Sequence, residues 1–353
     1  MNDTNVILVT GVAGYWGGRV ARRLLNEPDL HVIGLDTEPP ENVNIEALDY
    51  VQADVRNPLL PDLLNAAGVD AVCHLAFIGG VRRNETRFDT NVMGAMKLIG
   101  ACAESRVRRL VVKSSTMVYG ANANNSAFLA EDAPLNGGRR YGYNRYRLEI
   151  EAFINGFRRQ APELEMTVLR FANVVGPTAD TPFNRYLRGP IAPVLLGFDP
   201  LLQVTHEDDV VEALAHATLG ERSGPINVAA DPPMPLLRIL ALAGRVPLPI
   251  AHPLAYQAVR WLGSSRLGKA IPFEPDYLRY RWVADTERMR EELDFFPQFS
   301  GDEAVETVGT HLRLERYKPT ADEMAYDEER LQQTIARRRQ SAAAEEAKEV
   351  ENG

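Results

Sequence analysis

The sequence has little of what marks secreted, membrane-spanning or nucleic-acid-binding proteins. Its only two cysteines, Cys73 and Cys102, have no CxxC spacing, so we expect reduced thiols in place of a disulfide framework or zinc site. Acidic residues outnumber basic ones by 48 to 39, and this net charge of −9 disfavours nucleic acid as a partner. No run of about 18 apolar residues is present, and residues 1–5 lack the basic segment of a signal peptide. We therefore expect a soluble, cytoplasmic protein without a membrane span.

Short apolar segments alternate with helical ones along the first half of the chain. The overall composition, 45% hydrophobic and 25% charged over 353 residues, is typical of a globular protein. Strands are predicted at residues 5–10, 31–35, 47–52, 69–76, 110–114 and 166–171, and helices at residues 15–26, 88–104 and 141–158. This alternation indicates βαβ units, and it predicts an α/β fold with a doubly wound parallel sheet.

Three glycines follow the first predicted strand and precede the first predicted helix. Gly11, Gly14 and Gly17 are spaced as GxxGxxG, with Tyr15 and Trp16 between the last two. The first glycine permits a tight turn, the second lets a pyrophosphate approach the backbone, and the third lets helix and strand pack closely. The helix N-terminus supplies amide donors for the anion. The spacing and its context predict a dinucleotide-binding loop.

Acidic residues follow the second and third predicted strands. Asp36 stands where a carboxylate binds the ribose hydroxyls of the adenosine. The next residues are Thr37 and Glu38 without an arginine, so a 2′-phosphate would meet repulsion and NAD is predicted over NADP. Asp54 and Val55 suit the adenine edge, although Asp54 could equally cap a helix.

The rhythm of the sequence changes after residue 176, where prolines become frequent. We expect a Rossmann-like NAD-binding domain over residues 1–176, to which segments near residues 203–230 return. Residues 177–317 are expected to form a smaller substrate lobe. Residues 318–353 are charged and alanine-rich, which predicts a solvated helix that frays into disorder.

An ordered series of further motifs gives the chain a family resemblance. The sequence resembles the extended short-chain dehydrogenase/reductase family, the NAD-dependent sugar epimerases and dehydratases, over roughly residues 5–310. The motifs are the glycine loop, His74-Leu75-Ala76, Asn91-Val92-Met93-Gly94, Ser114-Ser115-Thr116-Met117-Val118-Tyr119-Gly120, Tyr141, Leu169-Arg170-Phe171-Ala172-Asn173-Val174-Val175-Gly176-Pro177, His206-Glu207-Asp208-Asp209-Val210 and Val283-Ala284-Asp285.

The resemblance implies a catalytic set of Ser115, Tyr141 and Arg145. Ser115 would orient the substrate oxygen and Tyr141 would be the general acid or base. A phenol has a pKa near 10, so it needs a nearby cation to exchange a proton at neutral pH. In the family that cation is a lysine four residues after the tyrosine; here it is Arg145, with Glu149 matching the family's acidic residue. Arginine keeps the charge but removes a proton relay.

Two alternatives follow from this departure. Tyr143 and Arg147 have the same spacing as Tyr141 and Arg145, but they lack the register that Glu149 provides. The arginine also leaves room for a noncatalytic, NAD-binding regulatory protein on the same fold.

The family's remaining site residues carry over to matching positions. Besides Tyr141 and Arg145, the resemblance implies cofactor contacts from Leu75, Ala76, Asn91, Ser114, Phe171 and Ala172. Ser115 and Asn173 would hold the substrate. Asn91 and Asn173 have a structural alternative, in which buried amides cap nearby backbone.

The substrate cannot be read from these residues. Leu202 replaces the arginine with which nucleotide-sugar epimerases clamp the pyrophosphate, and a second arginine before Asp285 is also missing. Apolar residues at 235–250 and 254–262 could line a pocket for a hydrophobic ketone or alcohol, or form the core of the lobe. Candidate substrates are therefore sugars or sugar nucleotides, and alternatively hydrophobic ketones.

The acidic segment from His206 to Asp209 does not predict a metal site. It begins a helix, where acids interact favourably with the dipole. The family resemblance implies two partners. One is a small-molecule substrate, and the other is a second copy of the chain, bound through the helices at residues 88–104 and 141–158.

Overall fold

The computed structural model describes residues 5–40, 47–78, 85–138, 142–252, 254, 274–316, 328–335 and 338. Residues 1–309 form one compact unit and residues 310–353 a second. In the second unit, residues 328–335 are helical. None of the helices in the described ranges is long and apolar enough to cross a membrane.

The first unit is built on a seven-stranded parallel sheet, in the order β11–β6–β5–β4–β1–β2–β3. The strands are β1 (Asn5–Thr10), β2 (Leu30–Asp36), β3 (Asp49–Gln52), β4 (Ala71–His74), β5 (Arg109–Ser115), β6 (Glu165–Phe171) and β11 (Gly224–Val228). The predicted doubly wound, Rossmann-like sheet is thereby confirmed. The strand order reverses at β1, which lies between β2 and β4, and ligands of such sheets bind outside the carboxyl ends of the strands at this point.

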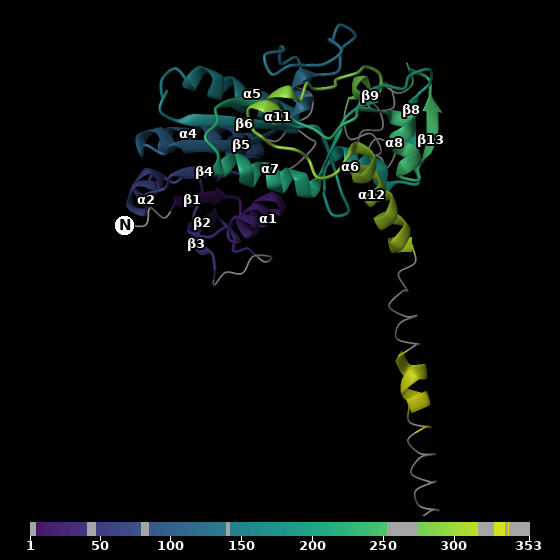
Figure 1. The fold of residues 1–353 in the computed structure, drawn as a ribbon, viewed down its shortest axis with the longest axis horizontal. Coiled ribbons are helices and arrows are strands. Elements are labelled where there is room, and N and C mark those ends of the chain that lie inside the picture. Colours follow the sequence, from purple (N-terminus) through teal and green to yellow (C-terminus); the bar gives the residue numbers. More distant parts are fainter. Residues whose placement is uncertain are drawn as a thin grey trace, which may run out of the picture. The chain divides into compact units, whose positions relative to one another are not determined.

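Helices cover both faces of the sheet (Figure 1). One core contains residues of α1 (Tyr15–Leu24) and α7 (Glu207–Leu219), and the other contains residues of α2 (Leu60–Ala67), α4 (Gly94–Glu104) and α5 (Gly142–Phe157). On β5, Val111 belongs to the first core, whereas Leu110 and Val112 belong to the second. Burial on both faces explains why the strands are continuous apolar runs without alternating polar residues.

The predicted helix at residues 88–104 is interrupted. A short helix α3 (Glu85–Phe88) leads through a π-helical turn (Asp89–Met93) into α4. Such turns are frequent at functional sites, and this one contains Asn91.

Smaller elements make up the rest of the described chain. They are a 3-10 turn (Thr116–Tyr119), β7 (Asn173–Val175), α6 (Pro182–Arg188), β8 (Ile191–Leu195), β9 (Leu201–Leu202), β10 (Val204–His206), β12 (Met234–Pro235), α8 (Leu236–Leu242), β13 (Val246–Ile250), a second 3-10 turn (Pro275–Leu278), α11 (Glu287–Glu291) and α12 (Gly301–Arg316). β10 pairs with β7, β12 with β9 and β13 with β8.

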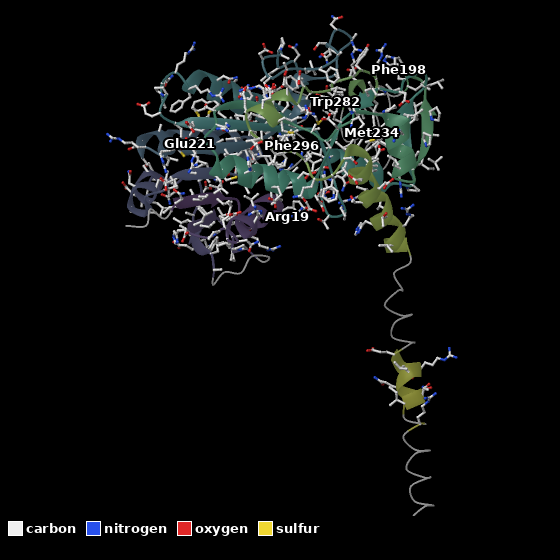
Figure 2. All side chains as sticks on the ribbon, in the orientation of Figure 1. Arg19, Phe198, Glu221, Met234, Trp282 and Phe296 are labelled. Carbon is white, nitrogen blue, oxygen red and sulfur yellow. The ribbon has the colours of Figure 1, made fainter. Side chains whose placement is uncertain are left out.

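Ion pairs join α1 to α7 across the surface of the first core. Arg19, labelled in Figure 2, pairs with Asp208, and Arg23 Nε lies 2.8 Å from Glu212 Oε2. These partly exposed pairs contribute little stability individually, but they align the two helices that flank the glycine loop.

A buried polar network joins α5 to the ends of β5 and β6. The Arg170 guanidinium donates to Glu151 Oε2 from Nε at 2.9 Å and from Nη2 at 2.7 Å. The Ser114 hydroxyl donates to Glu151 Oε1 at 2.5 Å, and Arg170 Nη1 donates to the Tyr119 hydroxyl at 2.7 Å. Only 2% of Glu151 and 2% of Arg170 is exposed, so each charge depends on the other for its solvation.

Removing one partner of this network should be strongly destabilising. We expect Glu151→Ala to lower the free energy of unfolding by about 3–5 kcal/mol, because Arg170 would remain buried without its counter-charge. Urea denaturation of the full chain measures the change. Glu292→Ala is the control, since Glu292 and Arg288 form a partly exposed ion pair at 2.6 Å that should contribute less than about 1 kcal/mol. Equal losses in the two variants would contradict a structural role of the buried pair.

Candidate cofactor and substrate site

The glycine loop is a tight turn that only glycine can form at two positions. Gly11 has a φ of +79°, and a Cβ placed on it would lie 2.6 Å from the Ala76 amide nitrogen. A Cβ on Gly17 would lie 2.0 Å from the Gly11 carbonyl oxygen. Helix α1 begins here, with Gly14 at its N-cap, no side-chain cap and no acid in its first turn. Its amides and the positive end of its dipole are therefore available to an anion.

The carboxylate of Asp36 lies beside this turn. Its Oδ2 accepts a hydrogen bond of 2.9 Å from the Ala13 amide, and its Oδ1 accepts one of 2.7 Å from the Thr37 amide. The backbone of the glycine loop thus fixes the carboxylate at the end of β2. A cradle without side chains next to an oriented carboxylate fits the diphosphate and the ribose of a dinucleotide.

The predicted adenine contacts have structural partners of their own. Asp54 Oδ2 lies 2.6 Å from Arg56 Nη2, and this hydrogen-bonded ion pair lowers the pKa of Asp54. Val55 is buried in the core beneath α2 and α4. Their contact with an adenine ring stays a prediction.

A cavity of about 220 Å³ opens at the carboxyl ends of β5 and β6. Its lining residues are Trp16, Leu75, Phe77, Ile78, Asn91, Lys113, Ser114, Ser115, Met117, Tyr146, Arg147, Phe171, Ala172, Asn173, Val174, Asp180, Thr181, Pro182, Phe183 and Arg185. Eight of the predicted site residues are among them: Trp16, Leu75, Asn91, Ser114, Ser115, Phe171, Ala172 and Asn173.

The other predicted residues lie elsewhere or outside the described ranges. Tyr141 is outside those ranges. Gly11, Gly14, Tyr15, Gly17, Asp36, Asp54, Val55, Ala76 and Arg145 are not part of the cavity lining. The Tyr15 hydroxyl donates to Glu207 Oε2 at 2.8 Å, so it is already engaged within the protein.

Two arginines of α5 point in different directions. The Arg145 guanidinium lies over the Phe88 ring, 4.7 Å from its centroid, whereas Arg147 lines the cavity. Residues two apart are about 200° apart around an α-helix. Positions 143, 147 and 151 therefore share one face, and Glu151 on that face is bound to Ser114 and Arg170. The cavity-facing arginine is the one from the alternative register, with Glu151 four residues after it.

Ser115 is the hydroxyl at the end of β5. Its Oγ accepts a hydrogen bond of 3.3 Å from the Met117 amide, which orients the side chain at the start of the 3-10 turn. Ser114 is on the opposite face of the strand and is bound to Glu151. The neighbouring serines therefore have different environments. Among the described residues, the Ser115 hydroxyl accepts a hydrogen bond but donates none, so its proton is available to a ligand.

Both predicted asparagines hold nearby backbone. Asn91 accepts from the Ile78 amide at 2.8 Å and donates to the Ile78 carbonyl at 3.0 Å, so it shapes the segment after β4. Asn173 Nδ2 donates to the Gln203 carbonyl at 2.9 Å. The structural alternative thus applies to both amides, and both also face the cavity.

The segment from His206 to Asp209 has structural partners throughout. His206 accepts from the Asp208 amide at 3.3 Å as the N-cap of α7, and Asp208 pairs with Arg19. Glu207 accepts from the Thr178 hydroxyl at 2.9 Å, and Asp209 accepts from the Gln298 amide at 2.7 Å. In the part of the chain that the structure describes, no three His, Cys, Asp or Glu side chains are grouped as metal ligands would be.

Lys113 was not among the residues predicted from the sequence. It lies two residues before Ser115 on the same face of β5. Burial and the nearby Arg147 lower the pKa of Lys113 to about 7. Its position in a strand that otherwise reads as apolar was the available signal. Removing a charged group from water costs free energy, so a lysine kept inside such a run is a candidate functional residue.

The sequence of this chain is similar to those of known proteins. A family model described as "NAD dependent epimerase/dehydratase family" matches residues 7–229. An uncharacterized protein of Mycobacterium tuberculosis is 33% identical over 309 residues, which cover 85% of this chain and 82% of the relative. A UDP-glucose 4-epimerase of Lactobacillus helveticus is 31% identical over 181 residues, covering 49% of this chain and 53% of the relative.

A solved structure agrees in fold over most of the chain. It is the UDP-glucuronic acid 4-epimerase of Bacillus cereus in complex with UDP-glucuronic acid and NAD, with a TM-score of 0.66 and 22% identity. The match covers 88% of this chain and 99% of that one. At this identity the likeness supports the fold alone.

The position of Asp36 predicts which dinucleotide binds. We expect Asp36→Asn, which keeps an acceptor for the Ala13 amide, to weaken NAD binding about 10- to 100-fold through loss of charged hydrogen bonds. The same change should improve NADP binding, because the repulsion of its 2′-phosphate is removed. Calorimetric titration with both dinucleotides measures this, with the exposed Asp49→Asn as the control. An unchanged ratio of the two affinities would refute the role of Asp36.

Proposed function

The chain belongs to the NAD-dependent epimerase/dehydratase family, and from this premise we propose that it transfers a hydride between NAD and a secondary alcohol or ketone. One observation carries the proposal: Ser115, Arg147 and Phe171 line a single cavity at the carboxyl ends of adjacent parallel strands. This is the edge on which the glycine loop also lies, since β1 and β4 belong to the same parallel sheet.

The cofactor residues follow from the fit described above. Gly11, Gly14 and Gly17 would hold the diphosphate against the start of α1, and Asp36 would bind the adenosine ribose. Phe171 and Ala172 would line the nicotinamide side of the cavity. NAD, when bound, supplies the hydride acceptor or donor. Everything else in the reaction is positioning and proton transfer by the chain itself.

Ser115 would hold the substrate oxygen by a hydrogen bond, while a tyrosine of α5 takes or returns the hydroxyl proton. We favour Tyr143 with Arg147 over the first expectation, Tyr141 with Arg145, because Arg147 faces the cavity and Arg145 packs on Phe88. A cation one helical turn from a phenol stabilises its phenolate form. The guanidinium stays charged, so it contributes a field without itself exchanging a proton.

Two substrate classes remain in competition within this proposal. The UDP-glucose 4-epimerase among the relatives favours a sugar nucleotide. The cavity wall favours a hydrophobic ketone or alcohol, because it contains Phe77, Ile78, Met117 and Phe183. Arg185 also lines the cavity, but its guanidinium is paired with Asp180, whose Oδ2 lies 2.5 Å from Arg185 Nη2.

A noncatalytic regulatory protein that binds NAD is the second candidate. It is favoured by the sequence of α5, in which both candidate tyrosines are followed four residues later by an arginine, Arg145 or Arg147, and not by the family's proton-relaying lysine. We also propose that two copies of the chain form a homodimer in which α4 and α5 pack against the same helices of the partner. The proposed location is the cytoplasm.

A substrate panel tests the function directly. We expect the purified chain with NAD to convert either sugar nucleotides, such as UDP-glucose and UDP-glucuronic acid, or apolar secondary alcohols. Reduced cofactor is followed by absorbance, and epimerised sugar, which leaves no net reduced cofactor, by chromatography. NAD binding without turnover of any member would favour the regulatory alternative, and absence of NAD binding would overturn both.

Paired variants of α5 distinguish its two registers. We expect Arg147→Met to lower turnover of the accepted substrate about 10²- to 10³-fold, in the range typical of lost acid–base support. Arg145→Met should change turnover less than about twofold, because its side chain lies on Phe88 outside the cavity. Tyr143→Phe and Tyr141→Phe should show the same contrast. The reverse order of effects would restore the Tyr141 register.

A further inference from the structure

Lys113 places an ammonium group between the glycine loop and the end of β6. Its Nζ lies 4.8 Å from the centroid of the Trp16 ring and 5.5 Å from that of the Phe171 ring. Trp16 belongs to the first turn of α1, directly after Gly14, and Phe171 is the last residue of β6. Lys113 therefore lies on the cavity wall between the proposed diphosphate cradle and the proposed reaction site.

The ammonium group has no counter-ion in the described part of the chain. Within those residues, the ammonium group makes cation–π contacts with the two aromatic rings and is repelled by the charge of Arg147. The acids of the surrounding elements are already engaged. On α5, Glu151 binds Arg170; beside α6, Asp180 binds Arg185; and on α7, Glu207 binds the Tyr15 hydroxyl of α1. Tyr146 of α5 is the remaining titratable side chain in the described cavity lining.

An ammonium group in this position is unfavourable until an anion arrives. Desolvation and the charge of Arg147 both favour the neutral amine, and they lower the pKa of Lys113 to about 7. Cation–π contacts with two rings offset this only in part. An anion in the cavity would supply the missing opposite charge and reverse the balance.

We propose that Lys113 is an anion-binding residue that takes up a proton when a diphosphate enters the cavity beside the glycine loop. The inference rests on the proposed function, since it uses the same cradle. The ligand chemistry is a phosphate-ester anion, which NAD carries and which a nucleotide-sugar substrate would also carry. Lys113 thereby couples ligand binding to protonation, which Arg147 cannot do because it is always charged.

The sign of the pH dependence follows from linkage. The free chain loses the Lys113 proton as the pH rises through about 7, whereas the bound chain, with its raised pKa, keeps it. Affinity is therefore highest below the free pKa, and it falls by up to about tenfold per pH unit above it, until the pKa of the bound form is reached. In that window, close to one proton is taken up for each ligand bound.

Calorimetry of the full chain tests this without any turnover. Titrations at about pH 8.5 in two buffers of different ionisation enthalpy give the number of protons exchanged. We expect nearly one proton taken up with NAD and with ADP-ribose, and none with adenosine, which lacks phosphate. Uptake with UDP but not with ADP-ribose would assign the anion to the substrate, and uptake with none of these ligands overturns the inference.

Two substitutions separate charge from packing. Lys113→Met keeps a long apolar side chain between the rings, and it should abolish proton uptake and flatten the affinity between about pH 6.5 and 8.5. Lys113→Arg should also abolish uptake, yet bind more tightly than the natural chain at the higher pH, because arginine remains charged there. The control is Lys97→Met, since Lys97 is exposed on α4.

Retained proton uptake in Lys113→Met would overturn the assignment to this residue. Binding of NAD to the natural chain, with no proton uptake for NAD, ADP-ribose or UDP, would overturn the inference and leave the proposed function intact. A natural chain that binds neither NAD nor ADP-ribose would instead overturn the proposed function.

Discussion

The buried pair of Glu151 and Arg170 is the interaction on which the site depends. It fixes the rotation of α5 relative to β5 and β6, because neither charge can be buried without the other. Ser114 binds the same carboxylate, so the strand that ends in Ser115 is held to the helix at the same point. Once Glu151 faces the sheet, the residue one turn before it, Arg147, must face the cavity. The electrostatics of the site therefore follow from a structural ion pair outside it.

The sheet and its ligand edge could be predicted from the sequence with little ambiguity. Apolar runs buried on both faces leave a clear signal, and the strands at residues 110–114 and 166–171 were placed within one residue of the observed β5 and β6. The glycine loop was equally clear, because Gly11 and Gly17 are positions where a Cβ would overlap backbone atoms. Both kinds of signal are local in the sequence.

The rotation of α5 was not predictable in this way. Both Tyr141–Arg145 and Tyr143–Arg147 have the required spacing, and Glu149 and Glu151 each lie four residues after one of the arginines. Glu151 is distinguished by its partners, Arg170 of β6 and Ser114 of β5, which are distant from it along the chain. Sequence periodicity defines a helix, but the choice of its buried polar face depends on contacts that are distant along the chain. The same limit applies to Lys113: its place in an apolar strand was visible in the sequence, but the two rings beside it come from segments distant along the chain.

The cavity separates two roles of positive charge that a single lysine could combine. Arg147 is a fixed charge, and its field acts at every pH at which the protein is folded. Lys113 is a conditional charge, because desolvation and Arg147 together keep it near its titration point. Because Arg147 is on helix α5 and Lys113 is on strand β5, the two charges have different neighbours. Those of Lys113 include the Trp16 and Phe171 rings. An arginine on α5 in place of the family's lysine therefore leaves one group in the cavity lining, Lys113, that can exchange a proton near neutral pH.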